Sequence, residues 1–380
     1  MILKSKLPNV GTNIFTVMSA LAREHKAINL SQGFPNFDCP TRLKSLVAYY
    51  MKEGYNQYAP MQGVPELTKA ISNKIKLFYG ADINPKDEIT VTSGATQAIY
   101  SAITALVHPN DEVIIIEPAY DSYKPTIELC GAYAIPYTLK GPDYKIDWSE
   151  FPHLFSRNTR MIIINNPHNP TGKILDEEDL IQLKNLTQGT NILILSDEVY
   201  EHLIYDDVKH QSVLKFPELY NRSVCTFSFG KTFHNTGWKM GYFVAPPNLT
   251  REIRKVHQFN VFSVNTPMQY AIAEFSENVD FFKELPIFYQ KKRDFFLSKM
   301  EKSRFMPINS KGTYFQLFDY SQISDLPDVA FAKWLLKEHK IATIPVSPFR
   351  SKHIDEKVIR VCFAKTEEIL EKASNKLTNV

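Results

Sequence analysis

The sequence predicts an α/β protein with a mostly parallel sheet. Short β-branched runs recur along the first two thirds of the chain, and the segments between them have helical periodicity. The runs are apolar on both faces, as strands covered by helices on each side must be. Because strands and helices alternate, the expected architecture is a parallel sheet between helical layers.

The expected elements can be placed in order along the chain. Helices are expected at 96–107 and at 176–187, and Asp176 is a plausible N-cap of the second. After about residue 267 the pattern changes to long charged amphipathic segments, a few short strands and a final helix at 366–377. This change predicts a second, smaller α+β domain. The expected strands are 89–93 (ITVTS), 113–117 (VIIIE), 161–165 (MIIIN), 192–196 (ILILS) and 223–229 (SVCTFSF).

Composition and charge exclude several classes of function. The chain has 380 residues and a formal net charge of +3, with cations scattered among acidic residues, so nucleic acid is a poor candidate partner. The four cysteines, Cys39, Cys130, Cys225 and Cys362, form no C-x-x-C pair, which argues against structural zinc or a disulfide framework. No run approaches the ~20 apolar residues of a membrane span. We therefore expect a cytoplasmic protein that binds neither membranes nor a metal.

Lys231 lies in the stretch SFGKTFHNTGWKMGY, where the letters GKT resemble the end of a phosphate-binding P-loop. That motif requires a glycine five positions before the second glycine, because the backbone must curl around the phosphates. The residue at that position is Cys225, inside an apolar strand, and Gly237 and Gly241 interrupt the helix that should follow. The P-loop interpretation therefore fails. A lone lysine on an exposed turn remains the simplest alternative.

Polar groups at the ends of several predicted strands weaken that alternative. Asp197 follows the strand at 192–196, the turn NPHNPTG (166–172) follows the strand at 161–165, and GATQA (94–98) follows the strand at 89–93. Each has an ordinary explanation as well: a capping carboxylate, a stiff turn, or a common small-residue helix start. In open α/β sheets, however, ligands bind at these strand ends.

Taken together, these stretches resemble the fold type I pyridoxal-phosphate aminotransferases, the aspartate aminotransferase superfamily. The motifs NPHNPTG, SDEVY and SFGKTFHNTGWKMGY occur in that order, and the resemblance extends from INLSQGFPNF to VIRVCFAK. The stretches LSQGFPNFDCP, NQYAPMQGVPEL and IRKVHQFNVFSVNTP resemble the branch of methionine aminotransferases and kynurenine aminotransferases (glutamine transaminase K). The resemblance implies a large domain with a seven-stranded sheet (36–270), an N-terminal arm that joins the small domain (1–35) and a small C-terminal domain (271–380).

The resemblance implies the cofactor pyridoxal 5′-phosphate (PLP), bound covalently to Lys231. Once the substrate amine displaces it, Lys231 would move a proton between the substrate's α-carbon and the cofactor. Asp197 matches the aspartate on the pyridine nitrogen, where its charge raises the pKa of that nitrogen. Asn169 and Tyr200 match the donors to the phenolic oxygen of the ring. Tyr120 matches the aromatic residue stacked on the ring, although it could equally be a core residue.

The cofactor's phosphate is implied to bind at the helix start. Its ligands would be the N–H groups of Gly94, Ala95 and Thr96, with the hydroxyl of Ser228 and the charge of Lys239. Many superfamily members have arginine at the position of Lys239. Lysine keeps the charge but lacks the bidentate fork, so the anchoring geometry can differ.

The substrate groups and the partner subunit follow from the same resemblance. Arg360 matches the arginine that holds the substrate's α-carboxylate, assisted by Asn169 and the backbone at Gly33, although alone it could be an exposed strand arginine. Tyr58 matches a tyrosine that reaches the phosphate in the neighbouring subunit, which implies a homodimer with shared sites. Candidates for the side-chain pocket are Phe15, Tyr58, Tyr120 and Phe262.

The expected activity is transfer of an amino group between an L-amino acid and a 2-oxo acid by a ping-pong mechanism. An aromatic pocket favours methionine, aromatic amino acids, kynurenine or glutamine over dicarboxylates, which would need a second cation. One alternative is PLP-dependent β-elimination from cysteine conjugates or cystathionine, because the fold does not fix which bond breaks. The other is a non-enzymatic PLP-binding sensor. The physiological donor, acceptor and pathway stay open.

Overall fold

The computed structural model describes residues 3–380 and is built around one seven-stranded sheet, with the strand order β2-β8-β7-β6-β5-β3-β4. Strand β8 pairs antiparallel with both β2 and β7, and the other neighbours pair in parallel. The predicted fold class, α/β with a mostly parallel sheet between helices, is confirmed. The strands are β2 (Ile89–Thr92), β3 (Glu112–Glu117), β4 (Tyr133–Thr138), β5 (Thr159–Asn165), β6 (Leu193–Asp197), β7 (Ser223–Ser228) and β8 (Gly241–Val244).

Strands β4 and β8 were not among the runs that the sequence pattern indicated. Strand β4 contains Pro136, which cannot donate to a sheet, and it lies at the sheet edge, where a missing donor is tolerated. Strand β8 is short, begins at Gly241 and contains a single β-branched residue, Val244. Neither segment therefore has the apolar, β-branched composition that marks the buried central strands.

Helices cover both faces of this sheet. Successive side chains of a strand point to opposite faces, so an apolar strand places apolar side chains on each face, and both faces must be covered. In β3, Val113 and Ile115 pack into one apolar cluster, and Ile114 and Ile116 pack into another. The first cluster includes side chains of α4 (Gly94–Leu106), α5 (Tyr123–Leu129) and α9 (Pro247–Asn260). The second includes side chains of α3 (Pro65–Tyr79), α6 (Glu177–Thr187), α7 (Pro217–Tyr220) and α10 (Thr266–Phe275).

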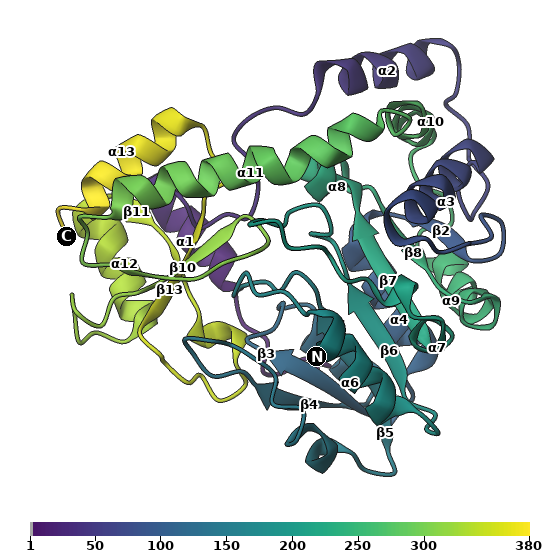
Figure 1. The fold of residues 1–380 in the computed structure, drawn as a ribbon, viewed down its shortest axis with the longest axis horizontal. Coiled ribbons are helices and arrows are strands. Elements are labelled where there is room, and N and C mark those ends of the chain that lie inside the picture. The colour runs from purple at the N-terminus through teal and green to yellow at the C-terminus, as the bar shows by residue number, and fades with distance from the viewer. Residues whose placement is uncertain (1–2) are drawn as a thin grey trace.

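The C-terminal elements form a smaller layered unit, and the start of the chain packs with them. Strand β1 pairs in parallel with β11, so that Ile28 lies opposite Ile341. Figure 1 shows the purple helix α1 among the green and yellow elements of the C-terminal part, with the green helix α11 crossing the upper part of the view below α2. The strands are β1 (Ile28–Asn29), β9 (Met306–Ile308), β10 (Phe315–Asp319), β11 (Ile341–Ala342), β12 (Ile344–Pro345) and β13 (Val358–Cys362). The other helices are α1 (Ile14–Glu24), α2 (Thr41–Lys52), α8 (Phe229–Thr232), α11 (Val279–Met300), α12 (Asp328–His339) and α13 (Glu367–Leu377).

Two kinds of feature are absent from residues 3–380. Within this range, no helix has both the length and the apolar character needed to cross a bilayer. The same residues contain no group of three or more His, Cys, Asp or Glu side chains placed to hold a metal ion.

Candidate active site

A cavity of about 260 Å³ lies at the carboxyl ends of β5, β6 and β7. These strands are parallel, so their ends meet at one edge of the sheet, as the sequence analysis expected for a ligand site. The cavity brings together most of the candidate residues: Phe15, Gly33, Gly94, Ala95, Thr96, Tyr120, Asn169, Asp197, Tyr200, Ser228, Lys231, Lys239 and Arg360.

Lys231 lies in the short helix α8, directly after β7. Its Nζ atom donates to the hydroxyl of Tyr314 (2.8 Å) and lies 3.4 Å from the carbonyl oxygen of Gly33. Burial lowers the pKa of Lys231 to about 8, and the positive charges of Arg360 and Lys239 act in the same direction. A neutral amine is a nucleophile, so this environment makes Lys231 reactive near neutral pH.

Asp197 is the last residue of β6, and its carboxylate is buried at the cavity wall. Its Oδ2 atom accepts a hydrogen bond of 2.5 Å from the hydroxyl of Tyr123. Burial raises the pKa of Asp197 to about 6, although this hydrogen bond opposes the shift. A buried carboxylate of this kind is stabilised by a cationic group, and the protonated nitrogen of a pyridine ring would supply one.

Asn165, the last residue of β5, connects Asp197 to the following turn. Its side-chain amide donates to the carbonyl oxygen of Asp197 (2.8 Å), and its Oδ1 atom accepts from the backbone N–H of Asn169 (2.7 Å). The side-chain oxygen of Asn169 in turn accepts from Nη1 of Arg360 at 2.8 Å. A continuous set of hydrogen bonds therefore connects the backbone of Asp197 and of Asn169, and through the Asn169 side chain the guanidinium of Arg360.

The start of helix α4 has the properties of an anion site. The preceding Ser93 makes no side-chain capping hydrogen bond, so the first N–H groups of the helix lack that partner. A Cβ atom at Gly94, where φ is +73°, would lie 3.5 Å from Nζ of Lys239. A Cβ atom at Gly241 would lie 2.8 Å from the backbone nitrogen of Ala95. Glycine at both positions leaves space and exposed donors, which fit a phosphate group.

Arg360, in β13, is 2% exposed, so it is not an exposed strand arginine. Its guanidinium carbon lies 3.8 Å from the ring centroid of Phe315 and 5.0 Å from that of Phe15. Nη2 donates to the carbonyl oxygen of Ser31 (3.2 Å), and Nε is buried without a hydrogen-bond partner. Burial lowers the pKa of Arg360 to about 10. An unpaired buried donor on a cation fits a carboxylate ligand.

Tyr58 and Phe262 lie outside this cavity. The side chain of Tyr58 is 84% exposed, and its ring makes an edge contact with that of Phe262 at 5.6 Å between centroids. Their predicted place in a neighbouring subunit's site needs a second chain and stays a prediction.

Several residues in or beside the cavity are not among the candidates named from the sequence. Asn165 carried a usable signal, since it is a polar residue at the end of a predicted strand, whereas Tyr123, which contacts Asp197, begins α5 and carried none. Gln32 and Phe315 also line the cavity, and Tyr314 contacts Lys231. These come from the start of the chain and from the small unit, and periodicity does not reveal which side chains meet between such distant segments.

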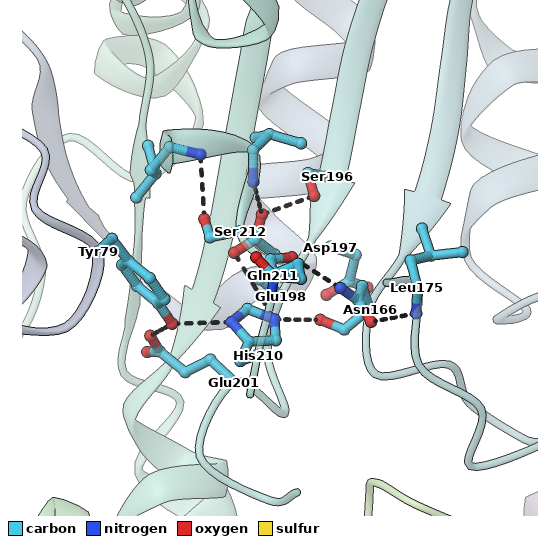
Figure 2. A network of polar contacts seen from close by, with 12 residues as sticks. Tyr79, Asn166, Leu175, Ser196, Asp197, Glu198, Glu201, His210, Gln211 and Ser212 are labelled. Carbon is cyan, nitrogen blue, oxygen red and sulfur yellow. Dashed lines mark hydrogen bonds and ion pairs between the residues drawn. The ribbon is translucent and has the colours of Figure 1, made fainter. Parts of the chain in front are cut away.

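A buried polar network supports the site from the opposite side of β6. Figure 2 shows His210 between Tyr79 and Asn166: its Nδ1 atom lies 2.9 Å from the hydroxyl of Tyr79, and its Nε2 atom lies 3.0 Å from the carbonyl oxygen of Asn166. Burial lowers the pKa of His210 to about 4, so the neutral ring donates from Nε2 to Asn166. The network therefore holds the first residue of the turn that carries Asn169.

Glu198 belongs to the same network and follows Asp197 directly. Its Oε1 atom accepts from the hydroxyl of Ser196 (2.8 Å) and from the backbone N–H of Val213 (3.2 Å) (Figure 2). Its Oε2 atom is buried without a hydrogen-bond partner and lies 4.0 Å from Nε2 of His210. Burial raises the pKa of Glu198 to about 8. The consecutive carboxylates of Asp197 and Glu198 therefore lie on opposite sides: Asp197 lines the cavity, and Glu198 belongs to the buried polar network.

The fold and the cavity define an enzyme of the PLP-dependent transferase type, with a partly buried lysine, a buried carboxylate and an anion site around one cavity. The sequence profile described as aminotransferase class I and II matches residues 25–377. The chain belongs to this family. It is a transaminase, and enzymes of this class and fold use pyridoxal 5′-phosphate bound to a lysine.

Individual relatives agree with this assignment. The chain is 48% identical to the methionine aminotransferase of Escherichia coli (strain K12), covering 98% of this chain and 97% of that protein. It is 33% identical to human kynurenine–oxoglutarate transaminase 1, covering 98% and 96% of the two chains. The crystal structure of an Escherichia coli protein identified as a methionine aminotransferase superimposes with a TM-score of 0.98, at 48% identity and with full coverage of both chains.

Proposed function

We propose that this transaminase takes the amino group of methionine, and more slowly of Phe, Tyr, Trp, kynurenine or Gln, and gives it to a 2-oxo acid by a ping-pong mechanism. The main support for this proposal is the cavity. Lys231, Asp197 and Arg360 line it together with aromatic side chains. The Escherichia coli relative named a methionine aminotransferase supports the choice of donor.

The cations of the cavity support a donor with an uncharged side chain. Among the described residues that line it, the cationic side chains are Lys231, Lys239 and Arg360. In our assignment Lys231 holds the cofactor, Lys239 its phosphate, and Arg360 the α-carboxylate of the substrate. A second carboxylate would then lack a cation, and the rings of Phe15 and Phe315 favour an apolar side chain.

We assign the cofactor contacts from the same geometry. When bound, PLP would supply an electron sink for the pair left on the substrate's α-carbon after loss of the α-proton. Lys231 carries the covalent bond to the cofactor and later holds the transferred proton at Nζ. Asp197 receives the pyridine N–H, and Asn169 and Tyr200 bind the phenolic oxygen. Tyr120 covers one face of the ring.

The phosphate and substrate contacts complete the assignment. The N–H groups of Gly94, Ala95 and Thr96 bind the phosphate together with Ser228 and Lys239. Arg360 binds the substrate carboxylate through its guanidinium group, alongside Asn169. Gly33 approaches the substrate through its backbone, and a Cβ atom there would lie 2.8 Å from the ring of Phe315.

We also infer a cytoplasmic homodimer in which Tyr58 and Phe262 contribute to the neighbouring site. The exposure of Tyr58 (84%) and of the nearby Phe259 (87%) supports an apolar contact with a second copy. The four unpaired cysteines fit a reducing compartment. Sedimentation of the holoenzyme should give twice the chain mass, and a monomer that turns over at the full rate would contradict shared sites.

A panel of amino donors against several 2-oxo acids tests the proposed activity. We expect the largest kcat/KM for methionine, smaller values for aromatic donors, and very slow turnover of aspartate. A preference for aspartate would contradict the assignment of the cavity cations. Pyruvate release from a cysteine conjugate without any amino acceptor, at a rate above transamination, would instead favour a β-lyase. Absence of turnover with every donor would favour a PLP-binding sensor.

A further inference from the structure

Tyr314 lies beside the amine of Lys231, although it comes from a distant part of the chain. It directly precedes β10 and is fully buried. Its hydroxyl is 2.5 Å from the carbonyl oxygen of Gly33 and 2.8 Å from Nζ of Lys231. One phenol therefore joins the N-terminal segment, the small unit and the reactive lysine.

The direction of these two hydrogen bonds follows from the number of available protons. A carbonyl oxygen can only accept, so the single phenolic proton of Tyr314 points to Gly33. Burial raises the pKa of Tyr314 well above its usual range, which keeps that proton in place. The lone pairs of the phenolic oxygen are then left for an N–H of Lys231.

This arrangement orients the free amine. A neutral lysine amine has two N–H bonds and one lone pair. Nζ directs one N–H to Tyr314 and lies at the longer distance of 3.4 Å from Gly33, so the lone pair is left for a third direction. We propose that Tyr314 is a positioning residue that docks the free Lys231 amine and keeps its lone pair available for the substrate's α-proton. This inference rests on the proposed role of Lys231.

The hydrogen bond from Lys231 to Tyr314 also affects the pKa of Lys231. An acceptor stabilises an ammonium group more than an amine, so loss of the Tyr314 oxygen should lower the pKa of Lys231 further. Such a substitution would leave in place the other titratable groups around Nζ. They are Asp197, Tyr200, Lys239, Arg360 and Cys362.

The variant Tyr314→Phe removes the oxygen and keeps the ring that packs against Tyr200 and Phe315 at 5.2 and 4.9 Å between centroids. A matched control is Tyr289→Phe. Tyr289 is equally buried, its ring lies 6.0 Å from that of Tyr314, and its hydroxyl contacts Nδ1 of His234 at 2.9 Å rather than Lys231. Both variants lose one buried hydroxyl, so a general loss of stability should appear in both.

The decisive measurement uses the apoenzyme. The rate at which an amine-directed reagent labels Lys231, followed by peptide mass spectrometry across pH, gives the pKa of this lysine. We expect Tyr314→Phe to lower that pKa by roughly one unit, the scale of one hydrogen bond to a charged group, and Tyr289→Phe to leave it unchanged. In single-turnover reactions, Tyr314→Phe should react roughly tenfold more slowly, with a larger isotope effect from α-deuterated methionine.

Two further results distinguish a failure of the proposed function from a failure of the proposed role of Tyr314. Borohydride reduction of the wild-type holoenzyme should fix the cofactor on Lys231, and fixation on another lysine would overturn the proposed function. Fixation on Lys231, together with an unchanged titration in Tyr314→Phe, would overturn only the role of Tyr314. If Tyr314→Phe does not fold, 3-fluorotyrosine at position 314 keeps the shape and weakens the acceptor. The pKa of Lys231 should then fall by a smaller amount, and no change would overturn the proposal.

Discussion

Arg360 and Asn169 are joined by a hydrogen bond of 2.8 Å although they are 191 residues apart in the sequence. The bond aligns the guanidinium group with the turn that follows β5. In our assignment both residues bind the substrate, so the substrate carboxylate meets a cation whose orientation is already fixed. Pre-organisation of this kind reduces the entropy that binding must otherwise overcome.

Substitution Arg360→Lys should keep the charge and lose the fork. We expect the KM for methionine to rise by roughly 10²-fold, because two hydrogen bonds to a charged group are lost, while absorbance of the bound cofactor is retained. Steady-state kinetics with cofactor spectra check this result. An unchanged KM would place the substrate carboxylate elsewhere.

Substitution Asp197→Asn should weaken cofactor function and change the pH dependence of the apoenzyme. The pKa of Asp197 is raised from 3.8 to about 6 by burial, so its protonated form favours the folded state. That contribution to the free energy of unfolding is complete below about pH 4 and is lost as the pH rises through about 6. In the Asn variant, the free energy of unfolding should not decrease over this pH range. Its catalytic rate should fall by at least roughly 10²-fold. Urea titrations of the two apoenzymes from pH 4 to 7 measure the first effect.

Substitution Glu198→Gln should stabilise the protein at alkaline pH. The pKa of Glu198 rises from 4.5 to about 8, so folding is most favoured below pH 4.5 and this contribution disappears as the pH passes about 8. Glutamine can keep both contacts to Oε1 and cannot ionise. We expect a gain on the order of a few kcal/mol at pH 8.5 and little change at pH 5, by urea unfolding. The exposed Glu338→Gln is the control, and equal effects in both variants would contradict the prediction.

Substitution Lys239→Ala should weaken the phosphate site without disturbing the rest of the cavity. We expect the dissociation constant of PLP to increase by roughly 10- to 100-fold, the effect of one lost charge-assisted contact. Inorganic phosphate should protect the wild-type apoenzyme against heat and protect the variant much less. Lys239→Arg is the matched comparison, because it preserves the charge beside Gly94. Equal PLP affinity in all three proteins would remove Lys239 from the phosphate site.

The sequence predicts the strand-end part of this site better than the rest. Asp197 and Asn169 each follow an apolar run, and parallel strands bring such positions together without further information. Tyr314 could not be found in this way, since its contact with Lys231 depends on how the small unit packs against the large sheet. Strand β4 was missed because Pro136 is acceptable only at an edge, and edge position is a property of the assembled sheet.

The pairing of β1 with β11 has a consequence for synthesis of the protein. Phe15 is synthesised long before Arg360, yet both line the same cavity. During translation the large sheet can form early, whereas Ile28 must wait for Ile341 to leave the ribosome. A nascent chain that stops before β11 lacks Arg360 and the strand that pairs with β1. In our assignment, amino acid binding is therefore acquired only after Arg360 has been made.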